Sequence, residues 1–140
     1  LFRIRKIHKT YLAIVLGNFS KNKGTFIDDL IYYENNSKIT AKAITRYEVL
    51  DSNNNYSLLK LHPETGRKHQ IRKQLLMRGC PVFGDSKYRI STNKIKRNSS
   101  LMLHAYKINF SIGANKYKYN ADLPEEFKKV LKEKYLKIYQ

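Results

Sequence analysis

The stretch from His62 to Leu76, HPETGRKHQIRKQLL, concentrates side chains that could do chemistry. A turn sequence, PETG, precedes a run of hydrogen-bond donors in which only Ile71 and the closing leucines are apolar. The donors are Arg67, Lys68, His69, Gln70, Arg72, Lys73 and Gln74. A plain amphipathic helix does not need so many donors, so this stretch is either a solvated surface or a binding site.

The charge of the whole chain favours a site for a polyanion. Its 140 residues include 28 Lys and Arg but 11 Asp and Glu, which gives a formal net charge of +17. Nucleic acid is the usual partner of such a surplus. An AT-rich genome would also enrich the chain in Lys, Asn, Ile and Tyr, and that alternative would give a basic surface without this purpose.

Composition argues against several other classes of protein. No apolar run reaches the length of a membrane span and no signal peptide opens the chain, so we expect no membrane partner. The single cysteine, Cys80, excludes an internal disulfide and suits a reducing cytoplasm, where we expect the protein. The histidines lie far apart without cysteine pairs, so we expect no metal and no other cofactor.

The donors must be positioned by the elements around them, and most of these are predicted strands. Apolar or alternating patterns predict strands over residues 9–16, 39–50, 56–61, 101–110 and 116–121. The sequence DSNNN between the second and third of these favours an antiparallel hairpin. The opening segment, LFRIRKIHKTY, looks like the end of a helix that runs into the first strand, so we expect the chain to begin inside a domain.

Two helices complete the expected fold. Thr65 is expected to cap a helix over residues 67–78 that ends at Gly79, with Ile71 and Leu75 on the face toward the sheet. A last helix should begin near Pro124, with glutamates in its first turn. Its apolar stripe comprises Phe127, Val130, Leu131 and Ile138. These elements predict an α+β fold in one domain: a mostly antiparallel, mixed sheet flanked by helices.

Four motifs in this order, KTYLAIVLG, ETGRKHQIR, GCPVFGDSKY and LMLHA, resemble the RluA-type pseudouridine synthases of ribosomal RNA. The resemblance runs from Leu1 to the start of the last helix. It implies that residues 1–140 are the C-terminal portion of a pseudouridine synthase catalytic domain, with RNA, and specifically ribosomal RNA, as the expected partner.

In that family the catalytic aspartate belongs to an H-R-L-D-x-x-T-S-G segment upstream of the K-x-Y strand, and these 140 residues contain no such segment. We therefore expect the chain alone to be inactive and a separately encoded N-terminal segment to be a possible partner. The alternative is a basic RNA-binding remnant that performs no chemistry.

The resemblance also implies catalytic roles for two side chains. Pseudouridine formation detaches uracil from its ribose, turns the base and rejoins it through carbon, so the nucleotide must be flipped into a pocket. Arg72 is expected to pair with the catalytic aspartate, and a fixed guanidinium would keep that carboxylate ionised and oriented. Tyr11 is expected to pack on the uracil and to reach it with its hydroxyl for proton transfer. The alternatives are an exposed helical arginine and an ordinary core tyrosine.

Four further residues are expected to bind substrate: Arg67, His69, Gln70 and Leu103. The first three suit phosphate and base-edge contacts at a helix N-terminus, whereas Leu103 would pack against the flipped base. His69 and Gln70 could equally brace the loop, and Leu103 could be a core residue of its strand.

Some positions depart from the family pattern or are interpreted as structural. A small apolar residue and a histidine usually follow the second arginine, but Lys73 and Gln74 stand there in this chain. Asp85, in VFGDSKY, is interpreted as a turn residue, and Cys80 as a small buried filler.

Overall fold

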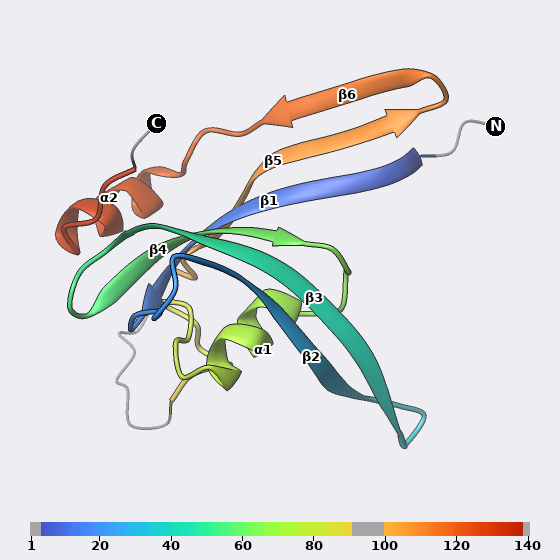
Figure 1. The fold of residues 1–140 in the computed structure, drawn as a ribbon, viewed down its shortest axis with the longest axis horizontal. Coiled ribbons are helices and arrows are strands. Elements are labelled where there is room, and N and C mark those ends of the chain that lie inside the picture. Colours follow the sequence, from blue (N-terminus) through green and yellow to red (C-terminus); the bar gives the residue numbers. More distant parts are fainter. Residues whose placement is uncertain (1–3, 91–99, 139–140) are drawn as a thin grey trace.

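The fold is an antiparallel sheet with two helices, seen in a computed structural model that describes residues 4–90 and 100–138 (Figure 1). The strands are β1 (Ile4–Leu16), β2 (Lys23–Glu34), β3 (Ser37–Ser52), β4 (Tyr56–Pro63), β5 (Leu103–Ile112) and β6 (Asn115–Asn120). They form one six-stranded sheet in the order β2-β3-β4-β1-β5-β6, and all its pairings are antiparallel. The helices are α1 (Gln70–Met77) and α2 (Glu125–Glu133). The predicted α+β class and the β3–β4 hairpin are confirmed.

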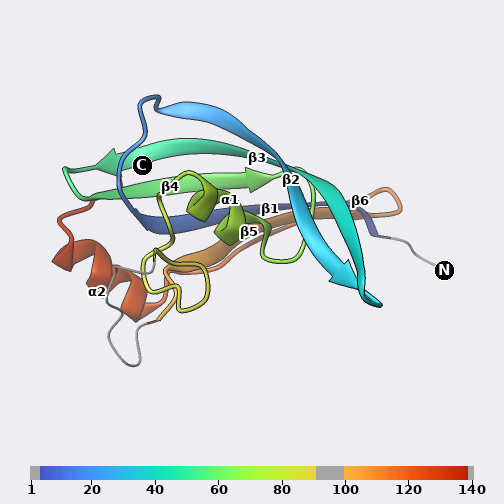
Figure 2. The same ribbon diagram turned by 90° about the horizontal axis from the view of Figure 1, so that it is seen from below.

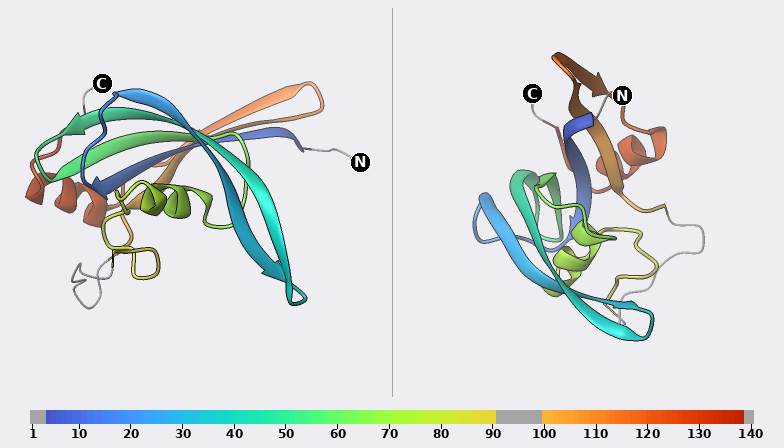
Figure 3. Two further views of the ribbon diagram at one scale, coloured as in Figure 1. Left: turned by 60° about the horizontal axis from the view of Figure 1, so that its bottom comes forward. Right: turned by 90° about the vertical axis from the view of Figure 1, so that its right-hand side faces the viewer.

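The sheet divides into two arms beyond the end of β4. Strand β1 pairs with β4 only from Tyr11 onward, where Tyr11 faces Leu61, but it pairs with β5 out to Ile4. Strands β2 and β3 continue together past Pro63 to their own hairpin turn. The views in Figures 1 and 3 show β2–β3 diverging from β1, β5 and β6 on this side of the molecule.

Two features of the sheet correct the sequence predictions. Residues 4–8, expected to end a helix, belong to β1 because their backbone pairs with β5; residues 1–3 lie outside the described part of the chain. Strand β2 was not predicted at all. Its apolar residues lie on both faces, with Phe26 and Leu30 buried but Ile27 and Ile31 exposed, which hides the alternation typical of a half-buried strand.

The core lies between the middle of the sheet and the two helices. Its strand residues include Ala13, Ile14, Leu58, Leu59 and Leu61, all without exposed surface. Helix α1 lies across one face of the sheet, as Figure 2 shows, and contributes Ile71 and Leu75 as predicted. Helix α2 contributes Phe127, Val130 and Leu131, whereas Ile138 lies beyond the end of the helix. Cys80 is buried in the same core, as expected of a filler.

The start of α1 differs from the sequence prediction. The helix begins at Gln70, three residues later than expected, and His69 precedes it with φ 54°, in the left-handed region. Thr65 does not cap the helix: its hydroxyl accepts the Ile44 N–H at 2.9 Å and donates to the Gln70 side chain at 2.6 Å. At the other end Gly79, with φ 72°, ends the helix as predicted.

Candidate functional site

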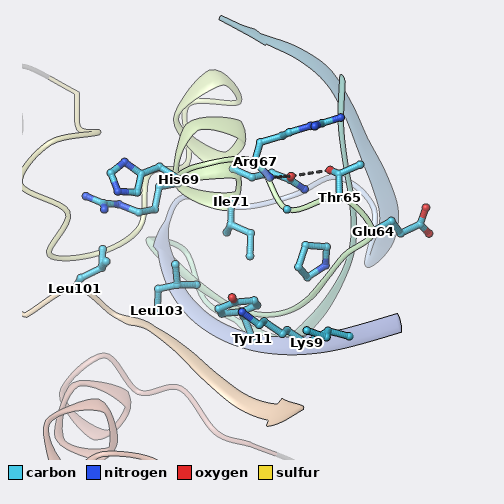
Figure 4. Close-up of a pocket in the computed structure, with 14 residues that line it drawn as sticks. Lys9, Tyr11, Glu64, Thr65, Arg67, His69, Ile71, Leu101 and Leu103 are labelled. Carbon is cyan, nitrogen blue, oxygen red and sulfur yellow. Dashed lines mark hydrogen bonds between the residues drawn. The ribbon is translucent and has the colours of Figure 1, made fainter. Parts of the chain in front are cut away.

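A cleft of about 560 Å³ opens between α1, the turn before it and strands β1 and β5 (Figure 4). A volume of this order is typical of small-molecule sites in proteins. The cleft is lined by all the site residues that the sequence singled out: Tyr11, Arg67, His69, Gln70, Arg72 and Leu103. These residues come from three separate parts of the chain, so the fold itself brings them together.

The floor of the cleft is apolar and comes from the sheet. Tyr11 of β1 and Leu103 at the start of β5 lie on the same face, because Leu103 pairs with Ala13, two residues along β1 from Tyr11. Figure 4 shows both side chains across the cleft from Ile71 of α1. A planar ring placed here would be held between apolar surfaces on two sides.

Arg72 lies in this cleft with its charge already paired to a buried carboxylate. Its Nε donates to Asp85 Oδ2 and its Nη2 donates to Asp85 Oδ1, both at 2.7 Å. The Asp85 side chain has no exposed surface and that of Arg72 is 17% exposed. A two-point bond of this kind fixes the plane of the guanidinium. The sequence interpretation of Asp85 was therefore incomplete: the residue is a turn residue and also the partner of Arg72.

The pKa values of this pair follow from the same contacts. Burial alone would raise the pKa of Asp85, but the hydrogen bonds from Arg72 and from the backbone of Tyr88 and Lys87 outweigh it and lower the pKa below 3.8. The hydrogen bond to Asp85 raises the pKa of Arg72. Both groups are therefore charged at neutral pH, and together they add no net charge to the cleft.

His69 and Tyr88 extend this cluster. The Tyr88 hydroxyl lies 2.8 Å from His69 Nδ1, and the Arg72 guanidinium carbon lies 4.9 Å from the centre of the Tyr88 ring. Partial burial, followed by the nearby charges of Arg72 and Lys87, lowers the pKa of His69. At neutral pH His69 is therefore a neutral ring that can donate or accept a hydrogen bond. Tyr88 closes the motif GCPVFGDSKY, but that motif does not reveal its contact with His69, which lies 19 residues away in the sequence.

Gln70 and Arg67 shape the rim of the cleft in different ways. The Gln70 amide is 4% exposed; its oxygen accepts from Thr65 and from the Arg67 N–H, and its nitrogen donates to Ile44 and Thr45. Because these hydrogen bonds use both the oxygen and the nitrogen of the side chain, they favour the alternative in which Gln70 braces the turn. Arg67 is exposed, and its Nε donates to the Lys42 carbonyl at 3.0 Å, so its remaining donors face solvent at the mouth of the cleft.

The two residues that depart from the family pattern fasten α1 to the sheet. Gln74 is fully buried; its oxygen accepts from Thr45 at 2.6 Å and its nitrogen donates to Asp28 at 3.0 Å, among other acceptors on β2 and β3. The Lys73 ammonium lies 3.7 Å from the centre of the Tyr32 ring. Neither residue lines the cleft, so both act on the position of the helix that carries Arg72.

The charge pattern of the cleft suits an anionic, planar ligand. Lys9 and Arg67 line it without a paired carboxylate among the described residues, whereas the charge of Arg72 is matched by Asp85. The one lining carboxylate in the same part of the chain, Glu64, pairs with Arg46 at 3.2 Å. Within the described ranges, no group of three His, Cys, Asp or Glu side chains is arranged to hold a metal ion. Nor does any described helix have the length and apolar character needed to cross a membrane.

The buried pair makes a testable contribution to stability. Asp85→Asn should lower the free energy of unfolding at neutral pH by about 3 kcal/mol, because it leaves Arg72 without its counter-charge. The pKa of Asp85 is lower in the folded protein than in the unfolded chain, so the contribution is complete above about pH 4 and is lost as pH falls below that value. The difference between wild type and variant should therefore shrink as pH falls below about 4. Urea denaturation at each pH measures it, and a constant difference would contradict an ionised Asp85.

Comparisons with known proteins, by sequence and by structure, match this chain to RNA pseudouridine synthases. The family model described as RNA pseudouridylate synthase matches residues 1–77. Ribosomal large subunit pseudouridine synthase D of Borreliella burgdorferi is 34% identical over 134 residues, which is 90% of this chain and 41% of that protein. Ribosomal large subunit pseudouridine synthase C of Rickettsia bellii is 35% identical over 144 residues, which is 92% of this chain and 46% of that protein. The chain thus spans less than half the length of these relatives.

Two solved human structures share the fold. The protein titled RNA pseudouridylate synthase domain containing 4 superposes with a TM-score of 0.79 at 22% identity, over 96% of this chain and 64% of its own. The protein titled RNA pseudouridylate synthase domain containing 1 gives a TM-score of 0.73 at 23% identity, over 84% of this chain and 55% of its own. At these identities the likeness concerns the fold.

Proposed function

This chain belongs to the RNA pseudouridylate synthase family, and we propose that it is the C-terminal part of a catalytic domain that isomerises uridine to pseudouridine in RNA. The observation that carries the proposal is that residues singled out in three separate segments line one cleft. The names of the similar bacterial proteins favour ribosomal RNA of the large subunit as substrate. Such a substrate would place the protein in the cytoplasm.

The reaction assigns a role to the floor of the cleft. The bond between N1 of uracil and C1′ of ribose breaks, the base turns, and C5 bonds to C1′ while the proton on C5 is released and N1 is protonated. The base must stay captive between these steps, and the surfaces of Tyr11 and Leu103 provide the walls. The Tyr11 hydroxyl is the group on this floor that can carry a proton to or from the base.

The polar residues at the rim of the cleft have separate roles in this proposal. Arg72 orients the catalytic carboxylate, and Arg67, at the mouth, contacts a phosphate of the bound strand. His69 offers a neutral ring to the edge of the flipped base. Gln70 holds the turn that carries Arg67 and His69, because its amide groups are fully used within the protein.

The carboxylate that attacks the sugar or base is the part of this chemistry that the cleft does not supply. Asp85 does not line the cleft, and both of its oxygens are used by Arg72 and by backbone N–H groups. We propose that the aspartate comes from a polypeptide segment of the type H-R-L-D-x-x-T-S-G, which the 140 residues do not contain.

A second candidate function is binding of RNA without chemistry. The pairing of Arg72 with Asp85 favours it, since the charge of the guanidinium is matched within this chain without a catalytic aspartate. The net charge of +17 suits both functions.

The two functions differ in the outcome of a reconstitution. The 140-residue chain is incubated with unmodified ribosomal RNA, alone and with a polypeptide that carries the H-R-L-D segment of a relative, and pseudouridine is measured by mass spectrometry after nucleoside digestion. We expect none from the chain alone, because a tyrosine and an arginine do not replace the carboxylate. We expect product when both polypeptides are present.

Two other outcomes of this reconstitution would change the conclusion. Turnover by the chain alone would overturn the assignment of the catalytic group to a missing segment. RNA binding without turnover in either mixture, provided that the added polypeptide associates with the chain, would support the second candidate function.

A further inference from the structure

A buried carboxylate behind the cleft, that of Asp85, holds two of the residues that line it. Its Oδ2 accepts from Arg72 Nε, and its Oδ1 accepts from Arg72 Nη2 and from the backbone N–H groups of Lys87 and Tyr88. The backbone bonds fix the start of the loop that carries Tyr88. Tyr88 in turn lies against Arg72 and bonds to His69. A single side chain thus determines the position of Arg72 directly and that of His69 through Tyr88.

Asp85 binds only one edge of the Arg72 guanidinium, so a second edge is available to another group. The pair occupies Nε and one N–H of Nη2, and in the described part of the chain no hydrogen bond uses Nη1. A guanidinium carries five N–H donors in one plane, so its Nη1–Nη2 edge can bind a second carboxylate while Asp85 keeps the first. Asp85 and a catalytic aspartate therefore do not compete for Arg72.

The backbone before Asp85 shows how tightly this carboxylate is placed. Gly84 has φ 82°, and a Cβ atom at this position would clash with the Ser100 carbonyl oxygen. Only glycine fits both the conformation and the space. The tight packing of the backbone at Gly84 therefore restricts where the next residue, Asp85, can lie.

We propose that Asp85 is a positioning residue: it presents the Nη1–Nη2 edge of Arg72 to the catalytic carboxylate in the cleft. This proposal rests on the function proposed above, which makes Arg72 the partner of that carboxylate. Asp85 itself touches neither base nor sugar, so it acts through Arg72.

The same helix offers a matched control. Arg78, one residue past the end of α1, donates to Asp28 at 2.8 Å, and the Asp28 side chain is 13% exposed. Neither residue lines the cleft. Asp28→Asn removes the charge of an ion pair on the same helix, keeps an amide oxygen that can accept from Gln74, and does not touch the guanidinium of Arg72.

The first measurement does not depend on activity. In the ¹⁵N-labelled 140-residue chain, the Arg72 Nε–H resonance, assigned by its loss in Arg72→Ala, should be protected from exchange with water in wild type and in Asp28→Asn. In Asp85→Asn the protection should fall at least tenfold, because the acceptor loses its charge. Equal protection in Asp85→Asn and wild type would overturn the proposal, whether or not the chain takes part in catalysis.

The second measurement uses the reconstituted enzyme. Asp85→Asn should lower kcat by about 100-fold with KM for RNA within threefold, because a displaced guanidinium misplaces the carboxylate and not the RNA. Asp28→Asn should leave kcat within threefold of wild type. A loss in Asp85→Asn no larger than in Asp28→Asn would overturn the positioning role.

Asp85→Glu keeps the proposal testable if Asp85→Asn does not fold. It retains the charge and the two-point bond but moves the guanidinium by the length of a methylene group. We expect Nε–H protection close to that of wild type together with a kcat lowered about tenfold. Full activity in Asp85→Glu would show that the position of Arg72 is not critical and would contradict the proposal. If the two polypeptides associate but wild type shows no activity, the proposed function fails, while the exchange measurement still decides whether Asp85 holds Arg72.

Discussion

The affinity of this chain for structured RNA is expected to fall by about three to five orders of magnitude between roughly 50 and 200 mM salt, if six to ten phosphates are contacted. The reason is that each phosphate neutralised by a Lys or Arg releases a counterion, and the chain has a formal net charge of +17. Fluorescence anisotropy of a labelled ribosomal RNA fragment, titrated at several salt concentrations, gives the slope of log affinity against log salt.

Matched double variants distinguish a localised RNA site from a generally basic surface. Lys9→Gln with Arg67→Gln removes two cations that line the cleft, whereas Lys129→Gln with Lys132→Gln removes two exposed cations from α2. The cleft pair should reduce the slope by about two counterions, and the helix pair should leave it nearly unchanged. Equal effects from both pairs, or no salt dependence in wild type, would instead support the view that the charge reflects base composition of the gene.

The sequence predicted several elements of the fold because their local residue patterns are clear. The β3–β4 hairpin has alternating residues and a turn rich in Asn, and the core-facing pair Ile71 and Leu75 identifies the inner face of α1. Strand β2 escaped prediction because isoleucines lie on its exposed face as well as apolar residues on its buried face. Local patterns identify an element only when the two faces differ in polarity.

The start of α1 shows how tertiary contacts override a local signal. A threonine before a polar run is a common helix cap, but the Thr65 hydroxyl is used by the backbone of Ile44 on β3. The helix begins instead after His69, whose left-handed conformation turns the chain into α1. The bonds that decide this come from residues more than twenty positions away, so no pattern within the turn could reveal them.

The candidate site residues could be named from their motifs, but their partners could not. Tyr11, Arg72 and Leu103 were singled out by position in a motif, and the fold places all of them in one cleft. The interpretation of Asp85 as a turn residue was correct in its backbone bonds, yet it missed the ion pair with Arg72. A motif records which residue types recur, whereas the pairing depends on where the turn at Gly84 points the carboxylate.

Arg72→Ala in the reconstituted enzyme is expected to lower kcat by about 100- to 1000-fold or more, with RNA affinity within threefold of wild type. Arg72 is only slightly exposed at the cleft and its charge is matched by Asp85, so it contributes little to attraction of the phosphate backbone. Its loss instead frees the catalytic carboxylate from a fixed cation, which raises the carboxylate's pKa and lets it rotate. Single-turnover rates at saturating RNA, together with anisotropy titrations, separate the two effects.

Two control variants separate this role from a general loss of charge or stability. Arg72→Lys should be nearly as inactive as Arg72→Ala, because an ammonium cannot bridge Asp85 and a second carboxylate along two edges of one plane. Arg78→Ala, which removes the cation paired with Asp28 just past the end of the same helix, should retain kcat within threefold because Arg78 lies outside the cleft. Arg72→Ala leaves Asp85 buried without its counter-charge, and Arg72→Lys leaves it without the two-point bond, so rates must be compared at a temperature where circular dichroism shows every variant folded. If Arg72→Lys retained wild-type kcat, a simple positive charge would suffice, and the two-edged role of the guanidinium would be wrong.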